Sequence, residues 1–353
     1  MNDFPQDQRF VATRPFFNEQ LSCRVVLFLL TTFAMTAKLG CSVKPVPRGR
    51  ESQEVSLEKK SGIVFEQSRD RVNILVNGEP FTSYYFLGYK KPIFFPLRSA
   101  SGRVVTRGYP MVDDVPGESR DHPHHTGVWF AHGDVNGIDF WSESSGSGSI
   151  KHRKFHRVES GPKIGVLESS NDWISLSGDR ILTEIREVRV YSRYRVRVMD
   201  LTFQLIASDG AVTFGDTKEG TFGMRLAQSF TEKAGLVIQN SQGSKGEAEC
   251  WGKPARWVDY STRIDRDFLG VAILDHPQSF RHPTHWHARG YSLFAANPFG
   301  LHDFYNDDKK DGRYVLSQGQ SIQFRYRVYI YSGNAGQARI EKEYNAFEES
   351  LTK

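Results

Sequence analysis

The chain has 353 residues, of which 39% are hydrophobic, 13% aromatic and 25% charged. This length and composition suit one large folded core or two modest ones, and they exclude a mostly disordered chain. A mean hydropathy of −0.49 excludes a protein with many membrane spans. The 46 basic and 41 acidic residues are interleaved, so no basic stripe predicts a nucleic-acid partner.

The beginning of the chain is predicted to be a targeting segment. Arg24 precedes an uncharged, mostly apolar run at residues 25–37, which is too short to span a bilayer of about 30 Å. Such a run behind a positive flank is typical of a signal peptide, and the KLGC that ends at Cys41 resembles the end of a lipoprotein signal. We therefore predict a signal peptide over residues 1–41, with a buried helix of the folded domain as the alternative.

This prediction has consequences for location and for the cysteines. It implies an exported, periplasmic or envelope-associated protein, attached to a membrane only through a lipid on Cys41 if that residue is modified. Cleavage before Cys41 would leave Cys250 as the one unmodified thiol, so no intrachain disulfide is expected and the fold must depend on its core. Residues 42–61 lack an apolar period and are predicted to be a polar linker.

From Gly62 onward the hydrophobic period is two, which is the period of β-strands. Apolar residues alternate with polar ones over residues 322–330, and the run at residues 269–274 (LGVAIL) is continuous, as expected of a central strand. The alternation over residues 188–198 changes phase after Asp200. That change predicts a bulge or a turn near Met199 and Asp200.

Turn signals separate the strands, and one helix is expected near the C-terminus, where Ile340, Tyr344 and Phe347 fall on one face. So many strands without alternating helices predict an all-β fold: a large antiparallel β-supersandwich followed by one short C-terminal helix. No change of composition divides residues 62–353, so we predict a single domain there.

All 11 histidines follow position 121, and they gather in two windows. The densest parts are residues 120–127 (RDHPHHTG), here called the first His cluster, and residues 275–287, the second His cluster. Imidazole exchanges a proton near neutral pH, so paired histidines suit acid–base catalysis, and the adjacent Asp121 and Asp275 could fix their tautomers. A purely structural role in turns and caps is the alternative.

We predict that three residues are catalytic, with His125 and His287 donating a proton or polarising the substrate and Glu219 accepting a proton. The predicted substrate-binding residues are Arg120, Asp121, His122, His124, Trp129, Arg225, His285, Trp286, Asn297, His302 and Asp303. Further indoles that could stack on a sugar face are Trp141, Trp251 and Trp257. The alternatives are core positions for the indoles and a surface pair for Glu219 and Arg225.

The two His clusters are expected to meet on one concave face, and catalysis by free histidines would give a pH limb near about 6.5. His122 and His124, like His285 and His287, are two residues apart and would share a strand face, as metal ligands also do. No complete metal-binding motif accompanies them. We therefore expect no cofactor, with a divalent metal on these four histidines as the alternative.

The stretch DHPHHTGVWFAHGDVNGIDFW at residues 121–141, the GTFGMR segment at 220–225 and residues 297–300 carry a resemblance to the bacterial PmoA-like family of exported proteins. The family name implies a methane monooxygenase subunit, an activity that this sequence does not support. More remotely, the pattern resembles the galactose-mutarotase type of β-supersandwich, which implies sugar binding on a concave sheet and proton transfer by His and a carboxylate.

Three functions follow from these patterns. The first is an exported acid–base isomerase, epimerase or lyase acting on a sugar or keto-sugar derivative, whose partner is a small-molecule carbohydrate. The second is a non-catalytic carbohydrate-binding protein of the envelope. The third is a metal-dependent lyase or oxygenase that uses the histidines as ligands.

Overall fold

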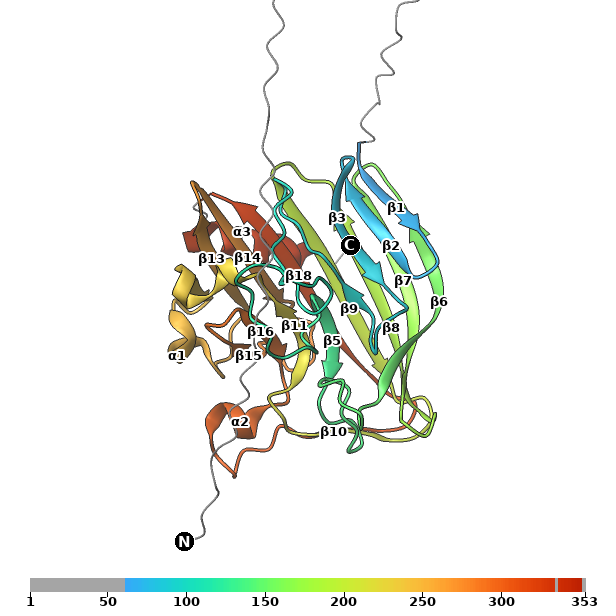
Figure 1. Cartoon of the computed structure of the whole chain (residues 1–353). Helices are drawn as coiled ribbons and strands as arrows, with labels where there is room; N and C mark the ends of the chain where they lie inside the picture. The colour runs from blue at the N-terminus through green and yellow to red at the C-terminus, as the bar shows by residue number, and fades with distance from the viewer. Residues whose placement is uncertain (1–60, 334–335, 351–353) are drawn as a thin grey trace, which may run out of the picture. The chain divides into compact units, whose positions relative to one another are not determined.

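The computed structural model describes residues 61–333 and 336–350, which belong to one compact unit built on two large antiparallel sheets (Figure 1). The predicted signal peptide, and the predicted linker up to residue 60, lie outside the described residues. Among the residues described, no helix is both long and apolar enough to cross a membrane.

The first sheet contains eight strands. In their order across the sheet they are β1 (Ile63–Gln67), β2 (Arg71–Val76), β3 (Glu79–Tyr85), β4 (Ile93–Phe94), β5 (Val128–His132), β11 (Gly220–Arg225), β16 (Leu293–Asn297) and β15 (His285–Ala288). All of these strands pair in antiparallel fashion.

The second sheet also contains eight strands. In order they are β12 (Val237–Asn240), β13 (Trp257–Ile264), β14 (Asp267–Asp275), β18 (Ser321–Ser332), β9 (Val196–Ile206), β8 (Arg180–Tyr191), β7 (Ile164–Ile174) and β6 (Ser149–Glu159). A small third sheet pairs β10 (Val212–Phe214) with β17 (Tyr314–Leu316).

Aromatic side chains join the two large sheets into a sandwich. The ring of Phe130 on β5 stacks on Phe203 of β9 with centroids 4.0 Å apart, and Phe222 of β11 stacks on Tyr326 of β18 at 4.9 Å. These four residues are almost completely buried. Burial of large rings between the sheets supplies the hydrophobic driving force of the fold, and the predicted all-β antiparallel sandwich is confirmed.

The outer face of the second sheet carries a second, smaller core. The C-terminal helix α3 (Gly336–Ser350) packs there, and its Ile340, Tyr344 and Phe347 are buried against strand residues that include Trp257. The predicted C-terminal helix is therefore confirmed. The described residues also contain two five-residue helices that the sequence did not reveal, α1 (Gly246–Cys250) and α2 (Leu301–Tyr305).

The predicted bulge near Met199 and Asp200 is wrong. The turn lies earlier, at residues 192–195 between β8 and β9, and β9 pairs with β18 without any shift of register. The hydrophobic phase changes because β9 is covered on both faces. Val196 and Val198 lie under α3, whereas Met199 and the following odd-numbered residues face the main core.

Candidate functional site

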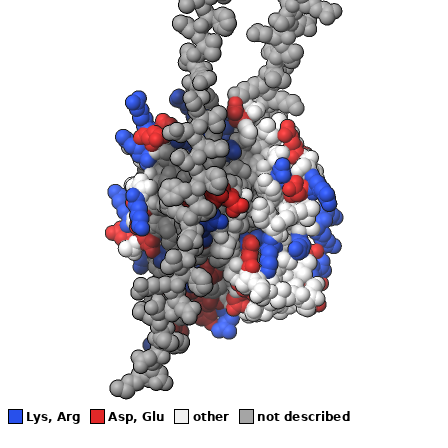
Figure 2. Space-filling view, viewed as in Figure 1, with Lys and Arg blue, Asp and Glu red and all other residues white. Residues whose placement is uncertain are grey.

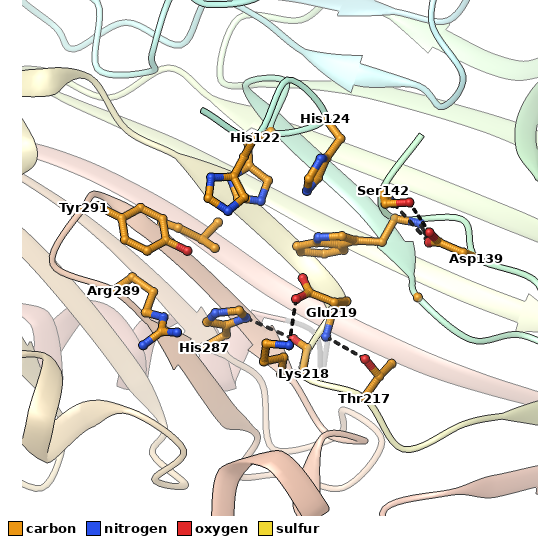
Figure 3. A pocket seen from close by; sticks show the side chains of 14 residues that line it. His122, His124, Asp139, Ser142, Thr217, Lys218, Glu219, His287, Arg289 and Tyr291 are labelled. Atoms are coloured by element: carbon orange, nitrogen blue, oxygen red, sulfur yellow. Dashed lines mark hydrogen bonds and ion pairs between the residues drawn. The ribbon is translucent and has the colours of Figure 1, made fainter. Parts of the chain in front are cut away.

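A pocket of about 300 Å³ lies on the face of the first sheet that is turned away from the second sheet (Figure 3). The row of paired residues that crosses the sheet there consists of Trp129, Gly223, Ala295 and His287. Gly223 lacks a side chain, and a Cβ at this position would meet the ring of Trp129 at 2.6 Å. The absence of a side chain at Gly223 therefore lets the rings of Trp129 and Trp141 lie over the sheet at this point.

His287 on β15 presents a free lone pair at this pocket. Its Nδ1 lies 3.0 Å from the carbonyl oxygen of Lys218, which can only accept, so Nδ1 carries the hydrogen. Its Nε2 is buried and has no hydrogen-bond partner. Burial, opposed by the bond to Lys218, lowers the pKa of His287 to about 3. The imidazole is thus neutral at pH 7, with an unsatisfied acceptor at a site where a ligand could donate to it.

The segment at residues 217–219 is held in place from several strands. Asn297 donates its amide to the carbonyl oxygen of Thr217 at 2.8 Å, and Asp303 accepts from the backbone N–H of Lys218 at 2.8 Å. The backbone N–H of Gly133 donates to the carbonyl oxygen of Glu219 at 2.7 Å. Asn297 and Asp303, both predicted to bind substrate, therefore position this segment and do not line the pocket.

Glu219 extends from this segment into the pocket, as Figure 3 shows, with His122 and His124 on the opposite side. Its carboxylate forms an ion pair with the Nζ of Lys218 at 3.2 Å, and about a third of each of these two side chains is exposed. Glu219 is therefore an accessible anionic group that can reach both a ligand and solvent.

The first His cluster is shaped by two buried arginines. Arg107 and Arg225 both donate to the same carboxylate oxygen of Asp121, at 2.6 and 2.8 Å. Arg107 also donates to the carbonyl oxygen of His122 at 2.8 Å. Burial raises the pKa of Asp121, but Arg225 and hydrogen bonds from Ser119 and His122 outweigh it and lower the pKa overall. Asp121 thus stays ionised and ties the loop to β11.

The rings of this cluster lie against one another, and His124 and His125 are neutral. Arg225 donates to Nδ1 of His125 at 3.1 Å, so the remaining hydrogen of His125 is on Nε2. Burial, with repulsion from His124 and Arg225, strongly lowers the pKa of His125. Burial and Lys91 lower the pKa of His124 to about 4. The ring of His125 stacks on His122 at 4.7 Å and on Trp129 at 5.3 Å. The expected pH limb near 6.5 therefore does not follow from His124, His125 or His287.

The structure brings His122, His124, His125, Glu219 and His287 to the pocket. Arg225 and Asp121 lie behind the first His cluster and hold it. Trp129 also lies behind, since its ring covers Gly223 next to Trp141, which does line the pocket.

Other predicted binding residues lie elsewhere. Trp286 is fully buried in the main core, because it alternates with His285 and His287 on β15, and its indole donates to Ala255. His285 shares the face of His287, but its Nε2 contacts the hydroxyl of Tyr305 at 3.2 Å.

Two further predicted residues contact acidic side chains at the surface. His302 contacts Asp308 at 3.0 Å, and Arg120 contacts Asp113 and Asp114 at 3.7 and 3.4 Å. None of His285, His302 and Arg120 lines the pocket.

Several residues that line the pocket were not predicted from the sequence. Arg289 and Tyr291 line it directly after the second His cluster, and the ring of Tyr291 stacks on His122 at 5.7 Å. Asp139 accepts from the backbone N–H groups of Trp141 and Ser142 at 2.7 and 3.0 Å. Arg289 and Tyr291 could have been found because they follow the second His cluster, and Asp139 because it lies in the stretch 121–141. Nothing in the sequence indicated that Arg107 holds the first His cluster.

The described part of the chain contains no group of three or more His, Cys, Asp or Glu side chains arranged to hold a metal ion. Of the four histidines considered as ligands, His285 is directed to Tyr305 and the other three line the pocket. A metal in the pocket would have to take its ligands from the four histidines His122, His124, His125 and His287 and the carboxylates of Asp139 and Glu219.

A two-sheet sandwich with a His-rich pocket on one outer face is thus the class of protein that fold and site define. The chain belongs to the DUF6807 family, described as a family of unknown function, whose model matches residues 71–345. This match does not test the resemblance to PmoA-like proteins, which stays a prediction. No curated protein matches the sequence.

Solved structures show remote likenesses. The chain is 9% identical to the GH36 α-galactosidase AgaA from Geobacillus stearothermophilus in complex with raffinose, with a TM-score of 0.40 over 77% of this chain and 40% of that one. It spans only that 40% of the α-galactosidase. Galactose 1-epimerase from Lactobacillus acidophilus NCFM is 7% identical, with a TM-score of 0.33 over 78% and 99% of the two chains. A galactose mutarotase-like protein from Clostridium acetobutylicum is 8% identical, with a TM-score of 0.34 over 77% and 95%.

Proposed function

We propose that the pocket binds a sugar or keto-sugar derivative and transfers a proton on it, as an isomerase or epimerase does. The observation that carries this proposal is the buried, unpaired Nε2 of His287, at a pocket that also holds the Glu219 carboxylate. An unsatisfied buried acceptor is costly, so such an atom points to a ligand that donates a hydrogen there.

The lining of the pocket favours a neutral polyhydroxylated ring. Its volume is at the small end of the range of about 300–1,000 Å³ for small-molecule sites, and Trp141 and Tyr291 offer aromatic faces to C–H groups. Lys218 pairs with Glu219, and Arg289 donates to Glu247 at 2.7 Å. The cations of the pocket are therefore already neutralised, which disfavours an anionic ligand.

Each polar group has a distinct role in this proposal. The ionised carboxylate of Glu219 removes a proton from the carbon next to a carbonyl, or from a hemiacetal hydroxyl, and returns it to another atom of the same substrate. The Nε2–H of neutral His125 polarises the substrate oxygen, as a neutral imidazole can. The Nε2 of His287 accepts from a neighbouring hydroxyl and orients the ring. With a pKa of about 3, His287 is a weak base, so orientation suits it better than proton removal.

Glu219→Gln, His287→Asn and the control His156→Ala test this proposal. Asn keeps an N–H that can donate to Lys218 but removes Nε2, and His156 is exposed on β6 outside the pocket. A panel of aldoses and keto-sugars is incubated in D₂O with each protein, and NMR measures anomeric exchange and carbon-bound deuterium. We expect Glu219→Gln to lower the rate by about 10²–10⁴, His287→Asn to lower it by about 10², and His156→Ala to leave it unchanged.

The same experiment separates the other two functions. If the wild-type protein binds a sugar but catalyses no exchange, the protein is a non-catalytic carbohydrate-binding protein and the proposed catalysis is wrong. Activity that a chelator abolishes, with bound metal lost in His287→Asn, would favour the metal-dependent reading. We prefer proton transfer to oxygenase chemistry of the kind that the PmoA-like name implies, because the pocket holds the accessible carboxylate of Glu219 beside the neutral imidazoles of His124, His125 and His287.

We also propose that the protein is exported and attached to a membrane through Cys41. The support is the short apolar run behind Arg24 and its end at a small residue and Cys41. Intact-mass measurement on protein from its native host tests this proposal. A mature species that begins at Cys41 and carries a lipid would support it, and one that retains residues 1–40 would contradict it.

A further inference from the structure

A second, larger concavity of about 730 Å³ lies at one end of the sandwich and shares no residue with the pocket. It is bordered by the β2–β3 turn, the β8–β9 turn, the end of β18 and the first part of α3. Its charged lining residues are Arg193, Arg195, Arg197 and Arg339 against Glu79 and Asp267. We call it the arginine groove.

The arginines differ in how far the protein itself neutralises them. Arg193 donates to both carboxylate oxygens of Glu343, at 2.7 and 2.8 Å. Arg339 has polar but uncharged partners, since it donates to the hydroxyl of Tyr329 at 3.1 Å and to the carbonyl oxygen of Ser332 at 3.5 Å. Arg195 is exposed and lies against its neighbour in the turn, Tyr194. Within residues 61–333 and 336–350, neither Arg195 nor Arg339 has a carboxylate at hydrogen-bond distance.

Arg197 gives an independent sign of a ligand. Arg197 is only 5% exposed, and its Nη1 donates to the carbonyl oxygen of Val196 at 3.2 Å. Its Nε is buried and has no hydrogen-bond partner. Burial lowers the pKa of Arg197, against an opposing effect of Glu79. Burial of a guanidinium with an unpaired N–H lowers the stability of the fold unless an anion accepts a hydrogen bond from it.

We propose that the arginine groove binds a phosphate-bearing anion. A guanidinium presents paired donors that match two phosphate oxygens, and Arg195, Arg197 and Arg339 line the same cavity. Arg339 lies in the first turn of α3, a turn that contains no acidic residue to compete for it.

The place of the groove indicates two sources for such a phosphate. Asn77 lines the groove, and it exchanges hydrogen bonds of 2.9 and 2.7 Å with Gly62. The chain therefore enters the described residues at the rim of the groove. If residues before Gly62 anchor the protein to a membrane, phospholipid headgroups are one source of such a phosphate. The other source is a soluble phosphate ester.

The test uses the full chain and inorganic phosphate, titrated by calorimetry at constant ionic strength. Arg195→Ala removes an exposed groove arginine, Arg197→Gln removes the buried one, and Arg153→Ala removes an exposed arginine on β6 outside the groove. We expect phosphate to bind the wild type and Arg153→Ala equally. Arg195→Ala should bind about tenfold more weakly or worse, because it loses a charge-assisted hydrogen bond.

Absence of phosphate binding by the wild type would overturn the proposal, as would equal binding by Arg195→Ala. Because Arg195 is exposed, that variant keeps the test valid even if Arg197→Gln does not fold, which circular dichroism would show. A second arm measures co-sedimentation with phosphatidylcholine vesicles that contain phosphatidylglycerol. If Arg195→Ala binds both phosphate and vesicles more weakly than Arg153→Ala does, the ligand is a lipid headgroup. If Arg195→Ala binds only phosphate more weakly, the ligand is a soluble phosphate ester.

Discussion

Three histidines of the first His cluster line the pocket, whereas only His287 of the second cluster does so. The remaining histidines of the second cluster serve the fold. Nδ1 of His282 contacts Asp275 at 2.8 Å, and its Nε2 contacts the hydroxyl of Tyr344 on α3 at 3.4 Å. His276 lies against Phe347 of the same helix, with ring centroids 4.9 Å apart. Similar residue composition thus lines a pocket in one cluster and attaches a helix in the other.

The difference comes from the backbone on which each cluster lies. The first His cluster lies in an irregular loop before β5, and Arg107 holds its carbonyl groups, so several consecutive side chains can turn to one side. The second His cluster spans the end of β14, a turn and β15, where strand geometry alternates the side chains. In this protein the run in the loop therefore supplies three pocket residues and the run across strand ends supplies one.

The largest expected effect concerns the second His cluster. Oδ2 of Asp275 accepts from His282 and, at 2.9 Å, from the backbone N–H of Thr284. Asp275→Ala leaves these buried donors unpaired and should lower the free energy of unfolding by about 3 kcal/mol. Urea unfolding followed by circular dichroism measures this change. Asp275→Asn is the matched control and should lose less, because it keeps an acceptor oxygen. A loss of less than about 1 kcal/mol in Asp275→Ala would contradict a structural role.

The next prediction compares how the buried His287 and the exposed His156 affect the pH dependence of the free energy of unfolding. Because the folded pKa of His287 is about 3 and the unfolded value about 6.5, the unfolded chain binds the extra proton between these values. The contribution of His287 to the free energy of unfolding is therefore fully present above about pH 6.5 and is lost as the pH falls toward about 3. Between pH 7 and pH 5, the wild type should lose about 2 kcal/mol more than His287→Asn.

Unfolding free energies at the two pH values check this difference. Burial raises the pKa of Asp259 to about 7, which acts in the opposite direction, but it acts equally in both proteins and cancels. His156→Ala should keep the full wild-type pH dependence, since His156 is exposed. An identical loss in the wild type and in His287→Asn would show that His287 is not held neutral in the fold.

The smallest expected effect is that of His285→Asn. His285 shares a strand and a face with His287, but it contacts Tyr305 and does not line the pocket. We therefore expect kcat/KM to change by less than about threefold, against the loss of about 10² for His287→Asn. Parallel kinetics of the two variants measure this contrast. A comparable loss in His285→Asn would extend the site toward α2.

Much of the fold was predictable because a period of two is a local property. Alternation over residues 322–330 predicted the core face of β18, and the continuous run 269–274 predicted the central β14. The spacing of Ile340, Tyr344 and Phe347 predicted the buried face of α3. The misplaced bulge in β9 shows the limit, because its phase depends on a helix that is more than a hundred residues away in sequence.

The candidate site was predictable only in part. Histidine density identified His122, His124, His125 and His287, whose side chains line one pocket, but it did not separate them from His285. Sequence by itself determined the strands and the two His-rich segments, because both depend on neighbouring residues. The tertiary structure decided which side chains share the pocket, since register placed Gly223 between Trp129 and Ala295 and directed Trp286 into the core. It also decided the protonation state of His287, because burial and a carbonyl 69 residues away fix its tautomer.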